Sequence, residues 1–121
     1  MSELNWVVRS GIATPEQLKD GTTEHKAIAG LYGFSVQHQP GRSIQELAAA
    51  GWFPNRHISV ATIEDLVAAG ENAGYNVSVV KSPGRGYHHT IEVPYPMTDD
   101  SARGLSSVFI QMLNPAPFAR P

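Results

Sequence analysis

Helix-start signals recur along the chain and leave room only for short strands between the helices. Each signal is a capping residue with an acidic or amide side chain three positions later, and three such pairs occur: Thr14 and Gln17, Ser43 and Glu46, and Thr62 and Asp65. The apolar runs between these signals are rich in β-branched and aromatic residues, which favour strands. The predicted strands are residues 6–10, 30–37, 57–61, 75–80 and 87–93.

A further helix is predicted near the C-terminus, from about Asp99 to Leu113. The following apolar residues have the spacing of one helix face: Leu105, Val108, Phe109, Met112 and Leu113. Short helices that precede and interrupt a small mixed β-sheet, with this C-terminal helix packed on it, define an α+β domain. The strand–helix–strand order of residues 57–80 predicts that its two strands run parallel. With 121 residues, the chain fits one domain, 1–121, around one core.

Composition narrows the classes of protein to which the chain can belong. Hydrophobic residues make up 41% and charged residues 17% of the chain, an ordinary balance for a globular domain. The absence of Cys excludes a disulfide framework and a thiolate zinc site. A net charge of -2 argues against a general nucleic-acid coat but allows a local basic site. The sequence predicts no signal peptide and no transmembrane segment, because no apolar run approaches the ~20 residues that a bilayer requires.

The segment SPGRGYHHTIEVP (residues 82–94) places a glycine-rich turn before a strand with two adjacent histidines. Side chains alternate across a strand and here form two sets: His88, Thr90 and Glu92 on one face, and Tyr87, His89, Ile91 and Val93 on the other. The first set is predicted to be open to solvent or a ligand, and the second to face the core. His88 is therefore the predicted catalytic residue, whereas His89 is predicted to be structural, with one ring nitrogen bonded.

Basic residues beside this strand favour phosphate chemistry. Lys81 precedes the turn and Arg85 lies within it. Arg42 is a further candidate for a basic surface beside His88. Arginine binds a phosphate through two donors at once, and histidine exchanges a proton near neutral pH. These parts suit cleavage of a phosphodiester. An ordinary solvated sheet face with a basic hairpin tip is the alternative interpretation of the same residues.

Strand geometry limits which residues can act together on one phosphate. At ~3.3 Å per residue, Glu92 lies ~13 Å from His88, whereas Thr90, at ~6.6 Å, can join His88 as a phosphate donor. A second acid or base is therefore expected from another strand, and the candidates are Ser35, Gln37, His57 and Ser59. His57 is the chemically attractive candidate, although a lone histidine at a loop edge is more often structural.

Most of the chain resembles small toxin modules found at the C-terminal tips of bacterial polymorphic toxins, including Rhs-type proteins. The resemblance rests on GFSVQHQPGRSIQELAAAGWFPNRHISVATIEDL, on SPGRGYHHTIEVPYPM and on the closing helix that ends in NPAP, from about Gly33 to Pro115. It implies a compact effector, usually a nuclease, that acts in the cytoplasm of a competing cell and is blocked by a cognate immunity protein. Ser35, His88 and Thr90 match the polar positions of such modules. This chain begins with its own Met and carries no delivery region, so an excised domain and a free-standing relative both remain open.

The sequence thus predicts a metal-independent ribonuclease that binds RNA and needs no cofactor. The predicted catalytic residues are His88, Thr90 and His57. The predicted substrate-binding residues are Lys81, Arg85, Ser35, Gln37 and Arg42. No pair of histidines has the spacing of a zinc protease, and His88 and His89 point in opposite directions, so no metal site is predicted.

Two other functions are compatible with the sequence. An ADP-ribosyltransferase would use Arg9 to bind the phosphates of NAD, with Ser35 and Glu92 on later strands, in the order which that class requires. In this chain, Gln37 stands where a second hydroxyl is usual. A non-catalytic binding module would use Trp52, Phe53 and Pro54 as an exposed aromatic anchor. The ordinary interpretation of these last aromatic residues is that they cap the core after a helix.

Overall fold

The computed structural model describes residues 5–29 and 32–118, except for the side chains of residues 23–29. Within this part, the strands are β1 (Trp6–Ser10), β2 (Gly33–His38), β3 (His57–Thr62), β4 (Ser78–Lys81), β5 (His88–Glu92) and β6 (Ile110–Leu113). The helices are α1 (Pro15–Ala29), α2 (Ile44–Gly51), α3 (Ile63–Asn72) and α4 (Asp99–Ser107). Residues 30 and 31, where the predicted second strand begins, lie outside the described residues. No described helix combines the length and apolar character needed to cross a bilayer.

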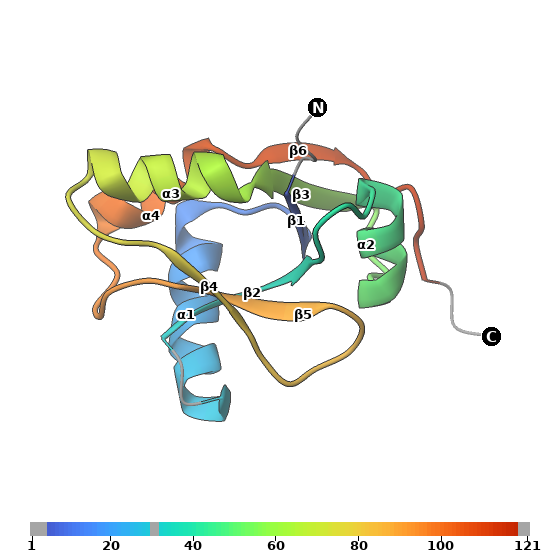
Figure 1. Ribbon diagram of the computed structural model, residues 1–121, viewed down its shortest axis with the longest axis horizontal. Coiled ribbons are helices and arrows are strands. Elements are labelled where there is room, and N and C mark those ends of the chain that lie inside the picture. The colour runs from blue at the N-terminus through green and yellow to red at the C-terminus, as the bar shows by residue number, and fades with distance from the viewer. Residues whose placement is uncertain (1–4, 30–31, 119–121) are drawn as a thin grey trace.

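The strands form one sheet in the order β4-β5-β2-β1-β3-β6 (Figure 1). The α+β class is confirmed. All the described neighbouring strands pair antiparallel, so the sheet is antiparallel rather than mixed. β3 and β4, the strands on either side of α3, do run in the same direction, but β1, β2 and β5 separate them. They cannot pair because both edges of β3 are taken by β1 and β6.

The predicted C-terminal helix is too long. α4 ends at Ser107, and residues 110–113 form β6, which pairs with β3. Phe109 packs against one hydrophobic cluster and Met112 against the other, on opposite sides of the sheet, as alternation along a strand requires. The helical spacing was misleading because pairing with β3 satisfies backbone hydrogen-bonding groups that would otherwise form an open sheet edge.

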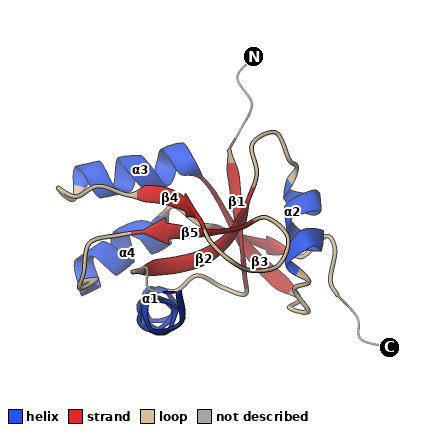
Figure 2. Cartoon of the chain, turned by 60° about the horizontal axis from the view of Figure 1, so that its bottom comes forward, coloured by secondary structure: helices blue, strands red, loops and turns tan. Residues whose placement is uncertain are grey.

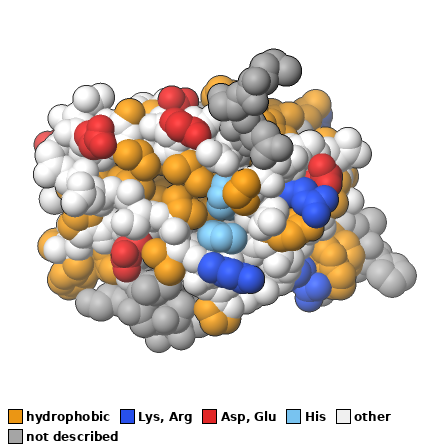
Figure 3. All heavy atoms as spheres, viewed as in Figure 1, with side chains coloured by type: hydrophobic (Ala, Val, Ile, Leu, Met, Phe, Trp, Pro, Cys, Tyr) orange, Lys and Arg blue, Asp and Glu red, His pale blue; other side chains and the backbone are white. Residues whose placement is uncertain are grey.

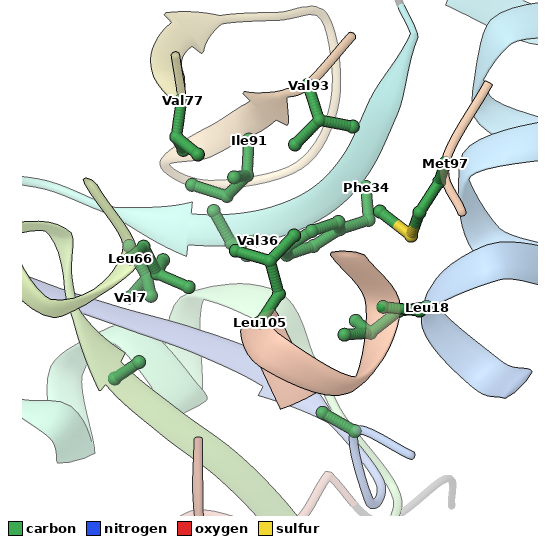
Figure 4. Close-up of a cluster of buried hydrophobic side chains, with 13 residues drawn as sticks. Val7, Leu18, Phe34, Val36, Leu66, Val77, Ile91, Val93, Met97 and Leu105 are labelled. Carbon is green, nitrogen blue, oxygen red and sulfur yellow. The ribbon is translucent and has the colours of Figure 1, made fainter. Parts of the chain in front are cut away.

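The two faces of the sheet carry separate hydrophobic clusters. On the face covered by α1, α3 and α4, here called the three-helix face, Phe34, Val36 and Leu105 point toward one another in the larger cluster (Figure 4). On the α2 face, Leu47 of α2 packs with Val8 in the smaller cluster. Figure 2 shows α2 standing apart from the other helices. Gln37 pairs with both Val8 and His88, so His88 points to the α2 face.

Candidate active site

The loop of residues 82–87 joins β4 to β5 and folds back over the start of β5. The backbone N–H of Ser82 donates a hydrogen bond to the carbonyl oxygen of His88 at 3.3 Å. Gly84 and Gly86 have φ values of 153° and 65°, a region that side chains other than glycine rarely enter. These two glycines therefore allow the loop to follow a path that brings it against His88.

His88 is half-buried and forms a hydrogen bond with a serine of this loop. Its Nδ1 atom lies 2.7 Å from Oγ of Ser82, and the same Oγ accepts a hydrogen bond from Oγ1 of Thr90 at 3.0 Å. A hydroxyl oxygen can accept a hydrogen bond from Nδ1–H of a neutral and of a protonated imidazole. The Ser82 hydroxyl can therefore keep His88 in place in both protonation states, as a general acid or base requires.

The sequence predicts that the row formed by His88, Thr90 and Glu92 is open to solvent or a ligand. The structure differs at the middle of the row. Thr90 is fully buried, because β4 pairs with this part of β5 and Ser82 lies against the Thr90 hydroxyl. Thr90 thus lies where it can position Ser82, and its hydroxyl is not exposed to a ligand. His88 and Glu92 are the partly exposed members of the row.

Gln37, predicted to bind substrate, uses its side-chain amide to hold the loop. Its Nε2 donates to the carbonyl oxygen of Arg85 at 2.8 Å, and its Oε1 accepts from the backbone N–H of Tyr87 at 2.7 Å. Only 4% of Gln37 is exposed. The structure therefore gives Gln37 a part in fixing the loop that carries Arg85.

Arg85 and Arg42 lie on the same face of the sheet as His88. The guanidinium carbon of Arg85 is 3.4 Å from the ring centre of Trp52, the residue that ends α2. Arg42 lies 5.5 Å from the ring centre of Tyr87 and forms an ion pair with Glu46 at 2.9 Å. Two of the three predicted cations thus lie on the side of His88. Figure 3 shows one face of the molecule, on which Lys and Arg side chains lie near histidines.

Lys81 lies on the opposite face of the strand pair. It is in register with His89, which alternation places on the other side from His88. The His89 ring is half-buried, its Nδ1 lies 2.8 Å from the carbonyl oxygen of Tyr87, and it makes an edge contact with the ring of His38 at 5.1 Å. The expectation that one nitrogen of His89 is bonded is confirmed, whereas the three predicted cations do not all meet beside His88.

A small hollow of about 70 Å³ adjoins His88 and is lined in part by Ser35 and Phe53. Ser35 is in register with Thr90, so the structure brings Ser35 and His88 together on one face. His57 is not part of this group. It begins β3, and β1 and β2 separate β3 from β5, a distance of about 14 Å across the sheet.

Of the three residues of the ADP-ribosyltransferase alternative, Arg9 and Ser35 line the hollow beside His88, whereas Glu92 does not. Arg9 is buried on the three-helix face, where Nη1 donates to the carbonyl oxygen of Ser35 at 2.7 Å and Nε donates to Oε1 of Gln17 at 3.1 Å. Burial lowers the pKa of the Arg9 guanidinium to about 10. Glu92 shares the face of His88, on the opposite side of the sheet. Arg9 and Glu92 therefore do not share this hollow.

The aromatic residues after α2 divide between two roles. Phe53 packs against the cluster on the α2 face, in line with the interpretation as a core cap. Trp52 is 48% exposed and stacks on Phe118, with ring centres 4.8 Å apart and planes 4° apart. Trp52 thus forms part of an aromatic stack at the surface.

Sequence reasoning missed Ser82 and Phe118, and it placed Tyr87 on the wrong face. Ser82 stands before Pro83 and reads as a turn residue, so nothing local connects it to His88, six positions later. Phe118 lies far from Trp52 in the chain. Tyr87 packs against the cluster on the α2 face because the regular alternation of β5 begins only at His88.

No protein-family model matches the chain, and no curated protein or solved structure is significantly similar to it. In the described part of the chain, no three His, Asp or Glu side chains are grouped so that they could hold a metal ion. The interpretation of the site therefore rests on its own geometry.

Proposed function

We propose that the chain is a ribonuclease-type phosphodiesterase that uses His88 as its general acid or base. The observation that carries this proposal is the hydrogen bond between Oγ of Ser82 and Nδ1 of His88. In this role Nδ1 keeps its contact with Ser82, and Nε2 would exchange a proton with the substrate. Arg85 and Arg42 add positive charge on the same face, which is suited to a phosphate.

The reaction that fits these groups is internal transesterification of RNA. His88 removes the proton of a 2′-hydroxyl, the 2′ oxygen forms a bond to phosphorus, and the bond from phosphorus to the 5′ oxygen breaks. The leaving 5′ oxygen takes a proton, and the products are a 2′,3′-cyclic phosphate and a free 5′-hydroxyl. Water supplies that second proton, and the hydroxyl of Ser35, which lines the hollow beside His88, is the candidate relay that gives one proton to the 5′ oxygen and takes one from water. The arginines would balance the charge that builds up on the phosphorane.

The resemblance to polymorphic toxin modules supports a biological extension of this proposal. The chain would act as an effector in the cytoplasm of a competing cell, and a cognate immunity protein would block it. The immunity protein would cover the face that carries His88 and Arg85, because this would exclude RNA from both the proton-transfer group and the cations.

A second candidate function is a binding module without catalysis. The exposure of Trp52 favours it, because large aromatic residues left at the surface are common anchors for partners. The two candidates differ in one measurable property, since only the enzyme converts RNA to shorter products.

Incubation of the purified protein with total RNA in EDTA tests the proposal, with a parallel reaction containing labelled NAD and cell lysate. We expect RNA fragments that end in cyclic phosphate and no label on protein. His88→Ala should lower the cleavage rate by at least about 10²-fold, the usual contribution of a general acid or base, with little change in melting temperature.

His89→Ala is the matched control from the same strand. It truncates a half-buried ring, so it should cost about 1–3 kcal/mol of stability and keep its activity per folded molecule. An active His88→Ala variant beside an inactive, stable His89→Ala variant would place the chemistry on the other face of β5. Intact RNA after incubation with the wild-type protein would instead favour the binding module.

A further inference from the structure

Arginine and aromatic side chains alternate on the surface beside His88. Arg85 lies over Trp52 at 3.4 Å, and Trp52 stacks on Phe118 at 4.8 Å. Arg42 lies over Tyr87 at 5.5 Å. These five residues are called the arginine–aromatic platform below. They come from the loop after β2, the end of α2, the loop before β5 and the segment after β6, so only the folded chain assembles them.

The backbone beneath the platform is fixed by hydrogen bonds and close contacts. Gln37 holds the carbonyl oxygen of Arg85, and a Cβ atom on Gly86 would lie 2.6 Å from the carbonyl oxygen of Ala50 in α2. The backbone N–H of Phe118 donates to the carbonyl oxygen of Phe53 at 2.9 Å. The loop, the end of α2 and the C-terminal segment are therefore tied together, which lowers the entropy lost when a ligand binds.

Trp52 itself combines an uncommon backbone conformation with an exposed side chain. It ends α2 with φ 54°, the single positive φ among the described residues other than glycine, and its N–H donates to the carbonyl oxygen of Ala49. Glycine or asparagine would suit this position better for helix capping alone. A tryptophan here that is 48% exposed adds little to the core, and its ring stacks with Arg85 and Phe118 at the surface.

The charge of the platform is available to a ligand. Arg85 forms no ion pair with any described residue, and a guanidinium stacked on a ring keeps its N–H donors in its own plane, directed outward. Arg42 is paired with Glu46 on the exposed surface of α2, where such pairs are weak and open to exchange. Phosphate oxygens can therefore bind without breaking a buried contact.

We propose that the arginine–aromatic platform binds single-stranded RNA and holds the nucleotide next to the phosphate at which His88 promotes attack by the 2′ oxygen. Bases stack on aromatic rings and on arginine planes, while phosphates bind in-plane N–H groups. In a duplex the bases are already stacked and paired, so the platform selects unpaired RNA. This inference rests on the proposed function for its substrate, but binding can be measured without cleavage.

Fluorescence anisotropy of a labelled ten-nucleotide RNA, uridine-only or adenosine-only, tests the inference. The protein carries His88→Ala in all samples, so that the RNA stays intact. Adding Trp52→Ala should weaken binding by about tenfold, within the range for loss of a base–aromatic stack, whereas Trp52→Phe should keep most of the affinity. Thermal unfolding of both variants separates a lost stack from a lost fold.

Charge is tested by Arg85→Gln, with Arg103→Gln of α4 as the matched control. Arg103 lies on the three-helix side of the molecule, in an exposed pair with Asp100. Arg85→Gln should weaken binding and reduce the slope of log affinity against log salt by about 0.7, the value for one phosphate contact on a single strand. Arg103→Gln should leave both quantities unchanged.

Several results would overturn the inference. One is that the His88→Ala protein binds RNA with the same affinity whether or not it also carries Trp52→Ala or Arg85→Gln. The others are that a duplex of the same length binds as tightly as the single strand, or that polyglutamate binds as tightly as RNA. Its failure is distinguishable from that of the proposed catalysis. If wild-type protein leaves all RNA intact but the binding differences appear, the platform stands and the reaction is wrong. If wild-type protein cleaves RNA and Trp52→Ala has an unchanged KM, the reaction stands and the platform is wrong.

Discussion

Gly84 lies so close to the ring of His88 that a Cβ atom at this position would be 2.6 Å from Cγ of the imidazole. The glycines of the loop could have served to bring backbone N–H groups near an anion. The structure shows a different use for Gly84, which leaves room for the His88 ring where it bonds to Ser82 of the same loop. The position of the proposed catalytic group therefore depends on the absence of one methyl group.

Gly84→Ala should displace the His88 ring and lengthen its hydrogen bond to Ser82. Since a misplacement of about 1 Å can lower a rate by about 10²-fold, we expect a loss of RNA cleavage between about tenfold and 10²-fold. The measurement is single-turnover cleavage beside thermal unfolding. Gly74→Ala is the control, because Gly74 also has a positive φ, 86°, but nothing lies within 4 Å of the added Cβ. Equal cleavage by both variants would show that Gly84 does not position His88.

The parts of the fold that local signals determine were predicted from the sequence. Ser43 and Glu46 form the capping box at the start of α2, and Thr62 caps α3, because these contacts involve only residues three positions apart. Strand β6 could not be found in this way. Ile110 and Leu113, 63% and 59% exposed, gain their conformation from pairing with β3, which is distant in the sequence.

The candidate site shows the same division between local and distant information. Alternation along β5 predicts that His88 and His89 point to opposite faces of the sheet. The register confirms this, because His88 pairs with Gln37 and His89 pairs with Val36, which lie on opposite faces. The face on which Lys81 lies depends on the register of β4 against β5, and the burial of Thr90 depends on that pairing. Neither can be deduced from the order of residues.

The capping box at α2 should make stability depend on pH through Glu46. The backbone N–H of Ser43, and then Arg42, lower the pKa of the Glu46 carboxyl. A lowered pKa in the folded state means that the carboxylate stabilises the fold above its unfolded pKa, and that this contribution disappears as the pH falls through the folded value.

Replacement of Glu46 by glutamine tests this pH dependence. The melting temperature of Glu46→Gln should lie below that of the wild type at pH 7, and the difference should shrink by pH 3. Melting curves at intervals between these values measure it. A difference that stays constant over the whole range would mean that the charge of Glu46 has no part in stabilising α2.

Gly21 of α1 faces the buried Arg9, and this contact should reverse the usual effect of a helix substitution. Gly→Ala inside a helix normally stabilises by about 1 kcal/mol. Here the new Cβ would lie 2.5 Å from Nη2 of Arg9, and the guanidinium cannot move freely because Gln17 and Ser35 hold it. Gly21→Ala should therefore destabilise the protein by about 1–3 kcal/mol, the usual range for overpacking.

A double-mutant cycle with Arg9→Met isolates this contact. Arg9→Met alone should also destabilise, because it leaves the carbonyl oxygen of Ser35 without this donor. In the Arg9→Met background, however, Gly21→Ala should cost much less or become stabilising, since the methionine can move aside. Urea unfolding of the four proteins gives the coupling energy, with Gly104→Ala in α4 as a control that has open space around the added Cβ. Additive effects within about 0.5 kcal/mol would show that Gly21 is not there to accommodate Arg9.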